Sequence, residues 1–274
     1  MVTQVMHQTS NASRGSVWLR ALTGTAPLAG YPASLQVVDA PLAGASARYI
    51  AVVPDPDNRF PRARQGEVGL VEGWQLARAV DEAVQADAAT ADKRPIVAVI
   101  DVASQAYGRR EEAYGIHQSL AGAAGAYAQA RLAGHPVIGL IVGKAMSGAF
   151  LAHGYQANRL IALDDPGVLV HAMGKASAAR ITLRSVESLE AFAASVPPMA
   201  YDIDNYAKLG LLWKLQRVGN ADAPDQTDLD QVRTTLEAAL ADIRADTAPD
   251  LAGRLRAPLR RASAQVRAHL RAQW

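Results

Sequence analysis

The chain of 274 residues contains no cysteine. This absence excludes a disulfide framework, a thiolate metal site and a thiol nucleophile. Aromatic residues are also scarce, at 5% of the chain, although half of all residues are hydrophobic. The core must therefore consist mainly of alanine, valine and leucine, and the length allows one large domain or two small ones.

Long hydrophobic runs are missing as well. Lys144 and His153 interrupt the best candidate, which falls short of the roughly 20 apolar residues that a membrane span requires. The first residues, MVTQVMHQTSNASRGS, lack the basic start and apolar stretch of a signal peptide. We therefore expect a cytoplasmic protein without membrane contact. A net charge of +2 gives no reason to expect a nucleic-acid partner.

Metal and nucleotide signatures are absent too. The six histidines show no metal-ligand spacing, and we expect His153 and His171 to be satisfied core histidines. The glycines at 66, 69 and 73 do not match a dinucleotide fingerprint. No metal or nucleotide cofactor is therefore predicted for this chain.

Strand and helix patterns alternate through the first 171 residues. Residues 1–16 are polar and expected to be mobile, and residues 54–66 form a loop rich in proline and charge. A turn around Pro41 and Gly44 joins the first two strands. The alternation predicts a mainly parallel α/β core. The expected strands are residues 34–39, 47–53, 95–100, 136–142, 159–163 and 168–171, and the expected helices are residues 68–86, 116–134 and 150–157.

The last fifty residues have a different character. Residues 227–244 carry an apolar helical face, with Thr227 as the expected N-cap, and residues 254–271 contain six arginines and no acidic residue. The basic end could bind phosphate or an acidic partner. We favour the other interpretation, in which both leucine faces pack against a partner or the core.

The most informative stretch is Gly143-Lys-Ala-Met-Ser-Gly-Ala-Phe150, between an expected strand and an expected helix. Small residues at such a corner leave backbone N–H groups uncovered at the positive end of a helix. Such donors suit a developing oxyanion, which indicates acyl chemistry on a thioester or ester. The alternative is a corner that is small only so that strand and helix can pack closely.

Four separated segments resemble the carboxyltransferase branch of the ClpP/crotonase superfamily, and within it the gamma subunits of biotin-independent malonate decarboxylases. These segments are IDVASQAYGRREEAYGIHQ (100–118), VGKAMSGAFLAHGYQANR (142–159), PGVLVHAMGKASAARITLR (166–184) and PPMAYDIDNYAKLG (197–210). The related acetyl-CoA carboxylase alpha subunits have GEGGSGGA at the corner. This chain keeps Gly143, Ser147 and Gly148 but departs at Lys144, Ala145, Met146 and Ala149, which argues against the biotin-dependent carboxylases.

The resemblance implies an α/β crotonase-like fold, a spiral of ββα units with a helical C-terminal region. The crotonase-like domain would cover residues 17–224, and residues 225–274 would form the amphipathic tail. The implied function is decarboxylation of a malonyl thioester to acetyl thioester and CO2 through an enolate. The implied partners are a beta subunit, an acyl transferase subunit and an acyl carrier subunit. The carrier bears a CoA-derived phosphopantetheine-type arm, so that this chain binds no cofactor itself and holds half of the site.

The expected site residues fall into two groups. The N–H groups of Gly148 and Ala149 are the candidate oxyanion donors, and Ser147 beside them is expected to cap the helix and not to act as a nucleophile. Candidate substrate-binding residues are Gln105, Ala106, Tyr107, Gly108, Gly143 and Lys144.

Two other functions remain open. A ClpP-like serine hydrolase would use Ser147 as nucleophile and His171 as base, with Asp202, Asp204 or Asp222 as the third member. A non-catalytic scaffold subunit would share the fold and supply only an interface.

Overall fold

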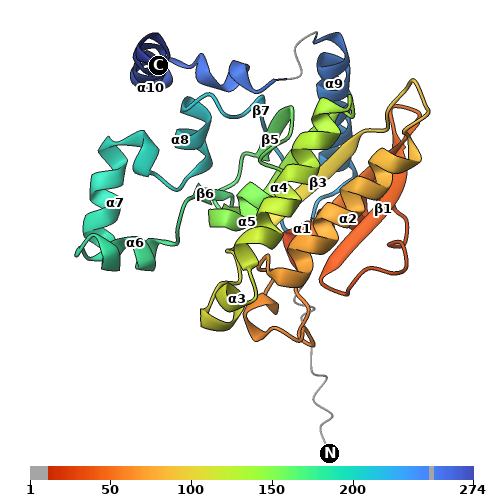
Figure 1. Cartoon of the computed structure of the whole chain (residues 1–274), viewed down its shortest axis with the longest axis horizontal. Helices are drawn as coiled ribbons and strands as arrows, with labels where there is room; N and C mark the ends of the chain where they lie inside the picture. Colours follow the sequence, from red (N-terminus) through yellow and green to blue (C-terminus); the bar gives the residue numbers. More distant parts are fainter. Residues whose placement is uncertain (1–11, 247–249) are drawn as a thin grey trace, which may run out of the picture.

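One mixed β-sheet with helices on both faces dominates the computed structural model, which describes residues 12–246 and 250–274 (Figure 1). The main strand order is β1-β2-β3-β4-β5-β7, and β6 pairs with β4 beside this path. Strands β1 and β2 form an antiparallel hairpin, and all other pairs are parallel. The strands are β1 Leu35–Leu42, β2 Ala45–Val52, β3 Ile96–Val102, β4 Val137–Met146, β5 Arg159–Leu163, β6 Leu169–His171 and β7 Lys214–Gln216.

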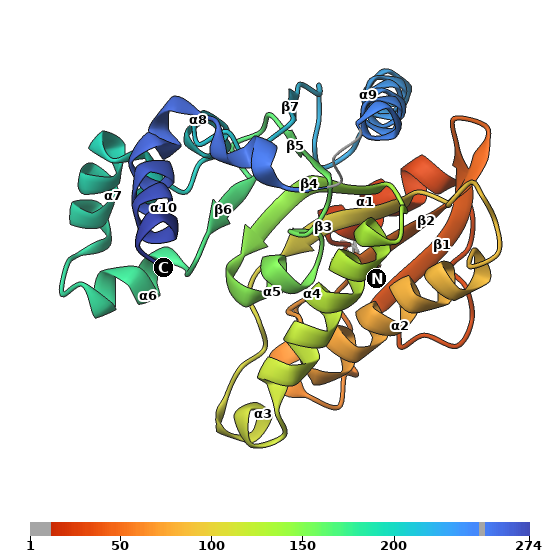
Figure 2. The same ribbon diagram turned by 45° about the horizontal axis from the view of Figure 1, so that its top comes forward.

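Four helices cover the sheet. Figure 2 shows α2 (Leu70–Ala86) and α4 (Ile116–Leu132) on one face, and α1 (Arg14–Thr23) and α9 (Gln226–Ala245) on the other. Because both faces are covered, β3 and the first half of β4 are buried along their length. The shorter helices are α3 Arg109–Ala113, α5 Ser147–Ala152, α6 Lys175–Ile181, α7 Val186–Ser195, α8 Ile203–Lys208 and α10 Arg261–Gln273.

The close approach of α2 and α4 depends on Gly73. A Cβ at this position would lie 2.1 Å from the Ser119 hydroxyl oxygen, so no larger residue fits. The hydroxyl donates to the carbonyl of Leu70 at 2.9 Å, which ties the two helices together. Trp74, which the helical pattern places on the apolar face, is 52% exposed and lies over Gly122 of α4.

Most predicted elements are confirmed, with shifted ends. The first hairpin turns at Ala43 and Gly44, both with positive φ, so that Pro41 belongs to the edge strand and not to the turn. Helix α9 is capped by Asp225, whose side chain accepts from the N–H of Asp228, so the prediction of Thr227 as N-cap is wrong.

The predicted mobile segment 1–16 falls largely outside the described residues, because the structure describes none of residues 1–11. Its boundary lies inside α1, which begins at Arg14 and buries Trp18 and Leu19. The Trp18 indole N–H donates to the Ala221 carbonyl at 2.8 Å, which links α1 to the segment before α9.

Beyond β6 the chain builds a small lobe from α6, α7 and α8 beside the main sheet (Figure 1). Its own apolar cluster contains Met146, Ala178, Leu189 and Tyr201, so the end of β4 connects the lobe to the sheet. No helix that the structure describes is long and apolar enough to cross a membrane.

The C-terminal region is attached at Arg254. Its guanidinium donates to the main-chain carbonyls of Tyr155 and Ala157, and burial lowers the pKa of this arginine. The segment that follows includes two short 3-10 helices, Ala252–Leu255 and Pro258–Arg260, and ends in α10.

Candidate active site

The turn from β4 into α5 is sharper than the sequence predicts. Strand β4 continues through Lys144 to Met146 because this end pairs with β6, and α5 begins at Ser147 instead of Phe150. Ser147 has a φ of 61°, a left-handed conformation that costs a side-chain-bearing residue roughly 1–2 kcal/mol. Such strain is concentrated at functional turns.

The prediction that Ser147 caps α5 is wrong. Met146 occupies the N-cap position, no side chain caps the helix, and Ser147 is its first residue. The Ser147 hydroxyl makes no hydrogen bond within the described residues. It is therefore free to face the adjoining cavity.

Gly148 and Gln105, two predicted site residues from separate segments, are brought together here. The Gly148 N–H donates to the side-chain carbonyl oxygen of Gln105 at 2.8 Å. Ala149, the second predicted donor, is fully buried. The Gly148 N–H thus already has an acceptor from this chain.

A cavity of about 490 Å³ opens beside this turn. Most of its walls are apolar, as in pockets that exclude water from an acyl group. It is lined by Gln105, Ser147, Gly148, Phe150, Leu151, Tyr155, Val170, His171, Ala172, Pro198, Ala200, Tyr206, Leu209 and Leu211.

His171 is the imidazole in this lining, and it lies opposite Met146 in the register of β6 against β4. Its ring stacks on Tyr201 with 3.9 Å between centroids, and Nδ1 lies 3.0 Å from the Met173 carbonyl oxygen. Burial lowers the pKa of His171. The ring is half-buried against the cavity, whereas the sequence predicts a core histidine; His153 is the fully buried one.

Asp202 and Asp222, two of the three candidate carboxylates of a hydrolase triad, are engaged elsewhere, and Asp204 is exposed in the first turn of α8. Asp202 caps α8 by accepting from the Asn205 N–H, and Asp222 pairs with Arg14 at 2.6 Å. Within residues 12–246 and 250–274, no carboxylate bonds to His171, because a backbone carbonyl holds its Nδ1. This arrangement weakens the hydrolase alternative.

Other predicted site residues lie away from the cavity. Gly143 packs against Asp101, the Lys144 N–H donates to the same carboxylate at 3.0 Å, and both residues line a separate hollow of about 300 Å³. After Gln105, Ala106 is buried in a small apolar cluster with Phe60.

Tyr107 and Gly108, the next two residues of the predicted turn, also lie outside the cavity lining. Tyr107 is 53% exposed, and Gly108 lies against the Arg62 side chain, with an added Cβ 2.6 Å from Nε. Of the nine predicted site residues, the cavity lining therefore includes Gln105, Ser147 and Gly148.

The remaining lining residues were not predicted as substrate contacts. Tyr206 and Leu209 reach the cavity from α8 and its end, and His171 comes from β6. These residues are 23 or more positions from Ser147 in the sequence, and only the topology brings them beside it. In the sequence, these three residues could have been found only through the segments 166–184 and 197–210, which resemble the family and contain them.

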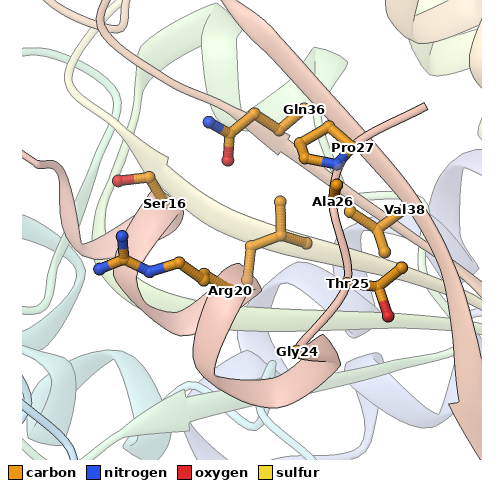
Figure 3. Close-up of a pocket in the computed structure, with 9 residues that line it drawn as sticks. Ser16, Arg20, Gly24, Thr25, Ala26, Pro27, Gln36 and Val38 are labelled. Atoms are coloured by element: carbon orange, nitrogen blue, oxygen red, sulfur yellow. The ribbon is translucent and has the colours of Figure 1, made fainter. Parts of the chain in front are cut away.

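A third hollow, of about 380 Å³, lies between the end of α1, the residues that follow it and edge strand β1 (Figure 3). Arg20 is the charged residue in its lining, and Ser16, Thr25 and Gln36 are among the polar ones. It does not include the strained turn or the imidazole. No group of three or more potential metal ligands is found among the described residues.

A family model and two solved structures agree on one family. The family model for the malonate decarboxylase gamma subunit matches residues 63–274. A solved Pseudomonas malonate decarboxylase hetero-tetramer in complex with coenzyme A contains a chain that is 68% identical, with a TM-score of 0.93, covering 96% of this chain and all of that one. The Pseudomonas MdcD-MdcE hetero-dimer is similar at 67% identity and a TM-score of 0.90, with the same coverage.

A curated relative from Malonomonas rubra, a malonyl-S-ACP:biotin-protein carboxyltransferase, is 36% identical over 157 residues. That match spans 56% of this chain and 54% of the relative. The transcarboxylase 12S core is 20% identical with a TM-score of 0.64, covering 86% of this chain and 42% of that one, and shows the shared crotonase-like fold. On the family match, the chain belongs to the malonate decarboxylase gamma subunits.

Proposed function

We propose that this chain supplies half of the site at which a carrier-bound malonyl thioester loses CO2 and becomes an acetyl thioester. The observation that carries the proposal is the cavity beside the β4–α5 turn, where Gln105 and Gly148 meet among apolar walls. The family membership supports the reaction class, and the cavity supports this location for it.

Decarboxylation of a malonyl thioester requires a hydrogen-bond donor and an apolar cavity. The bond between C2 and the carboxylate breaks, its electron pair forms an enolate, and negative charge develops on the thioester oxygen. A proton then adds to C2 of the enolate and gives the acetyl thioester. A hydrogen-bond donor aimed at that oxygen is worth roughly 3 kcal/mol in the transition state. Apolar walls favour the same step, because the concentrated charge of the carboxylate disperses as CO2 leaves.

The proposed partner that completes the site is the beta subunit. The Pseudomonas relative forms an MdcD-MdcE hetero-dimer. On this chain, the lobe next to the cavity exposes large apolar side chains, with Ile181 69%, Leu183 94% and Phe192 43% exposed. Exposed apolar residues gathered in this way are typical of a surface that a partner covers. An acyl transferase subunit and an acyl carrier with its CoA-derived arm would complete the proposed complex.

The test compares the isolated chain with the two-subunit assembly. Malonyl-CoA serves as a surrogate for the carrier-bound thioester, and CO2 release is measured for this chain, for the beta subunit and for both together. We expect turnover only from the assembly, because each chain would hold half of the site. Substantial turnover by the isolated chain would contradict the half-site.

A further inference from the structure

The side-chain amide of Gln105 is the group on which the candidate site converges. We propose that its NH2, and not the N–H of Gly148, is the donor that this chain extends to the thioester oxygen. Gln105 thus becomes a catalytic residue, and Gly148 becomes the group that positions it. This inference rests on the proposed function and specifies which atom performs it.

The hydrogen bond to Gly148 fixes the orientation of the amide. A backbone N–H can only donate, so the Gln105 atom 2.8 Å from the Gly148 nitrogen must be the carbonyl oxygen. The NH2 group therefore points away from Gly148. It makes no hydrogen bond to any residue that the structure describes, although Gln105 lines the cavity and is only half-buried. The donor left over therefore belongs to a residue in the cavity lining.

The backbone around Gln105 is held from both sides. Val68 donates its N–H to the Ser104 carbonyl at 3.1 Å and accepts from the Ala106 N–H at 2.9 Å. These two bonds clamp the residues that flank Gln105.

The clamp is itself anchored by the fully buried Glu72. Its carboxylate accepts from the Ser34 hydroxyl at 2.6 Å, the Asn58 amide at 2.7 Å and the Gly69 N–H at 3.0 Å. Because Gly69 directly follows Val68, this network fixes the segment that holds Gln105. A donor held in advance costs no reorganisation when charge develops.

The assignment also suits the reaction. A donor on the leaving carboxylate would stabilise the ground state and oppose the loss of CO2, whereas a donor on the thioester oxygen strengthens as the enolate forms. The amide keeps its protons throughout. The Gly148 N–H polarises the amide through its carbonyl oxygen, which makes the NH2 a stronger donor.

The alternative role for Gln105 is a plug that only covers the Gly148 N–H in the absence of substrate. The two roles predict opposite results for Gln105→Ala, which removes the amide and uncovers that N–H. A plug predicts an equal or higher kcat, whereas a donor predicts a loss. We expect kcat to fall by roughly 10²-fold with KM little changed, the effect of removing one oxyanion donor.

The experiment uses the assembled complex and malonyl-CoA, with CO2 release as the readout. Gln105→Glu keeps the shape but turns the free end into an acceptor, so it should lose at least as much kcat as Gln105→Ala. Gln105→Met keeps the side-chain volume but lacks the donor. If the other variants fail to assemble, a loss of kcat in Gln105→Met supports the donor role and an unchanged kcat contradicts it. Gln85→Ala, on the exposed side of α2, is the matched control and should not change kcat.

Failure of this inference is distinguishable from failure of the proposed function. If the unmodified complex releases no CO2 from malonyl-CoA, the proposed function fails. If that complex is active and Gln105→Ala or Gln105→Met retains its kcat, Gln105 is not the donor.

Discussion

Ser147 shows how much of this site is decided by a single backbone angle. Its left-handed φ turns the chain from β4 into α5 without a glycine, and the hydroxyl takes no part in capping. The sequence pattern could not reveal this, because a serine before a helix normally indicates an N-cap. The position therefore combines strain with a free hydroxyl.

We expect Ser147→Gly to raise the free energy of unfolding by up to about 1 kcal/mol relative to Ser147→Ala, since glycine adopts this conformation without a Cβ clash. Urea denaturation of both variants checks the difference. Both should keep most of the decarboxylase activity in the complex, because the hydroxyl is not the proposed donor. Inactivity of both variants would instead indicate a chemical role for the hydroxyl.

Gly148 is limited by space and not by its backbone angle. A Cβ there would lie 3.3 Å from the Gln105 side-chain oxygen and 3.4 Å from a Leu120 methyl carbon, both tight contacts. We expect Gly148→Val to displace the Gln105 amide and to reduce the kcat of the complex by about 10²-fold or more. Gly125→Val is the control, because a Cβ at Gly125 would meet no described atom outside its own helix within 4 Å. Equal kcat values for the two variants would contradict this role.

At the scale of single residues, the sequence could predict Gln105 and Gly148 because both lie in segments that resemble the family. It placed Gly143 and Lys144 in the same site because the run of small residues that begins at Gly143 indicates a corner between a strand and a helix. The structure continues β4 through them, since β6 supplies a pairing partner at Lys144. That partner lies 25 residues further along the chain and leaves no mark in the local pattern.

At the scale of elements, the buried runs in β3 and β4 and the period of α4 were sufficient to predict the core. The sequence analysis did not predict helix α1. Its apolar face consists of only Trp18, Leu19 and Leu22, and the glycine and polar residues around them weaken the helical pattern. The lobe helices α6 and α7 are short, and packing around Tyr201 and Leu189 helps to stabilise them. Local periodicity does not report such contacts.

His153 joins three elements, and this makes it sensitive to pH. Its Nε2–H donates to the Val99 carbonyl of β3 at 3.1 Å, so Nδ1 accepts from the Tyr127 hydroxyl of α4 at 3.0 Å. Burial lowers the pKa of His153 to about 4 from an ordinary value of 6.5. Above the ordinary value, the folded and unfolded chains both hold the ring neutral.

Between these two pKa values the unfolded chain binds a proton that the folded chain excludes, so acid favours unfolding. We expect His153 alone to reduce the free energy of unfolding by about 3 kcal/mol between about pH 7 and about pH 4, with no further loss below. Urea denaturation across this range should show a flatter pH dependence for His153→Gln. Parallel profiles for the two proteins would rule out this contribution.

At the scale of the whole molecule, the two C-terminal helices behave differently. Helix α9 buries Val232, Leu236 and Leu240 against the core, as the leucine pattern predicts. Helix α10 leaves all of its side chains exposed, including Val266 at 58% and Leu270 at 59%. Its contact with a partner stays a prediction.

We expect removal of residues 261–274 to leave the thermal unfolding midpoint of the isolated chain unchanged, because α10 buries none of its own side chains. Co-purification with the beta subunit should weaken, since the exposed apolar face is lost. Ending the chain at Pro224 is the contrasting variant. It removes α9 and should cost several kcal/mol of stability, at roughly 1.5–3 kcal/mol for each large buried side chain. A lower midpoint without α10 would show that this helix packs on its own chain.

The pairing of α1 with α9 across one face of the sheet has a consequence for synthesis. The guanidinium of Arg233 in α9 donates to the Ala21 carbonyl at 3.1 Å, and Trp18 is held by the Ala221 carbonyl. A growing chain displays the part of this apolar face that α9 covers while β1 to β5 emerge, because α9 is the later of the two helices to be made. Complete burial of that part therefore waits until the ribosome has released residues up to Ala245. Until then the nascent sheet is open to aggregation and in need of chaperone protection.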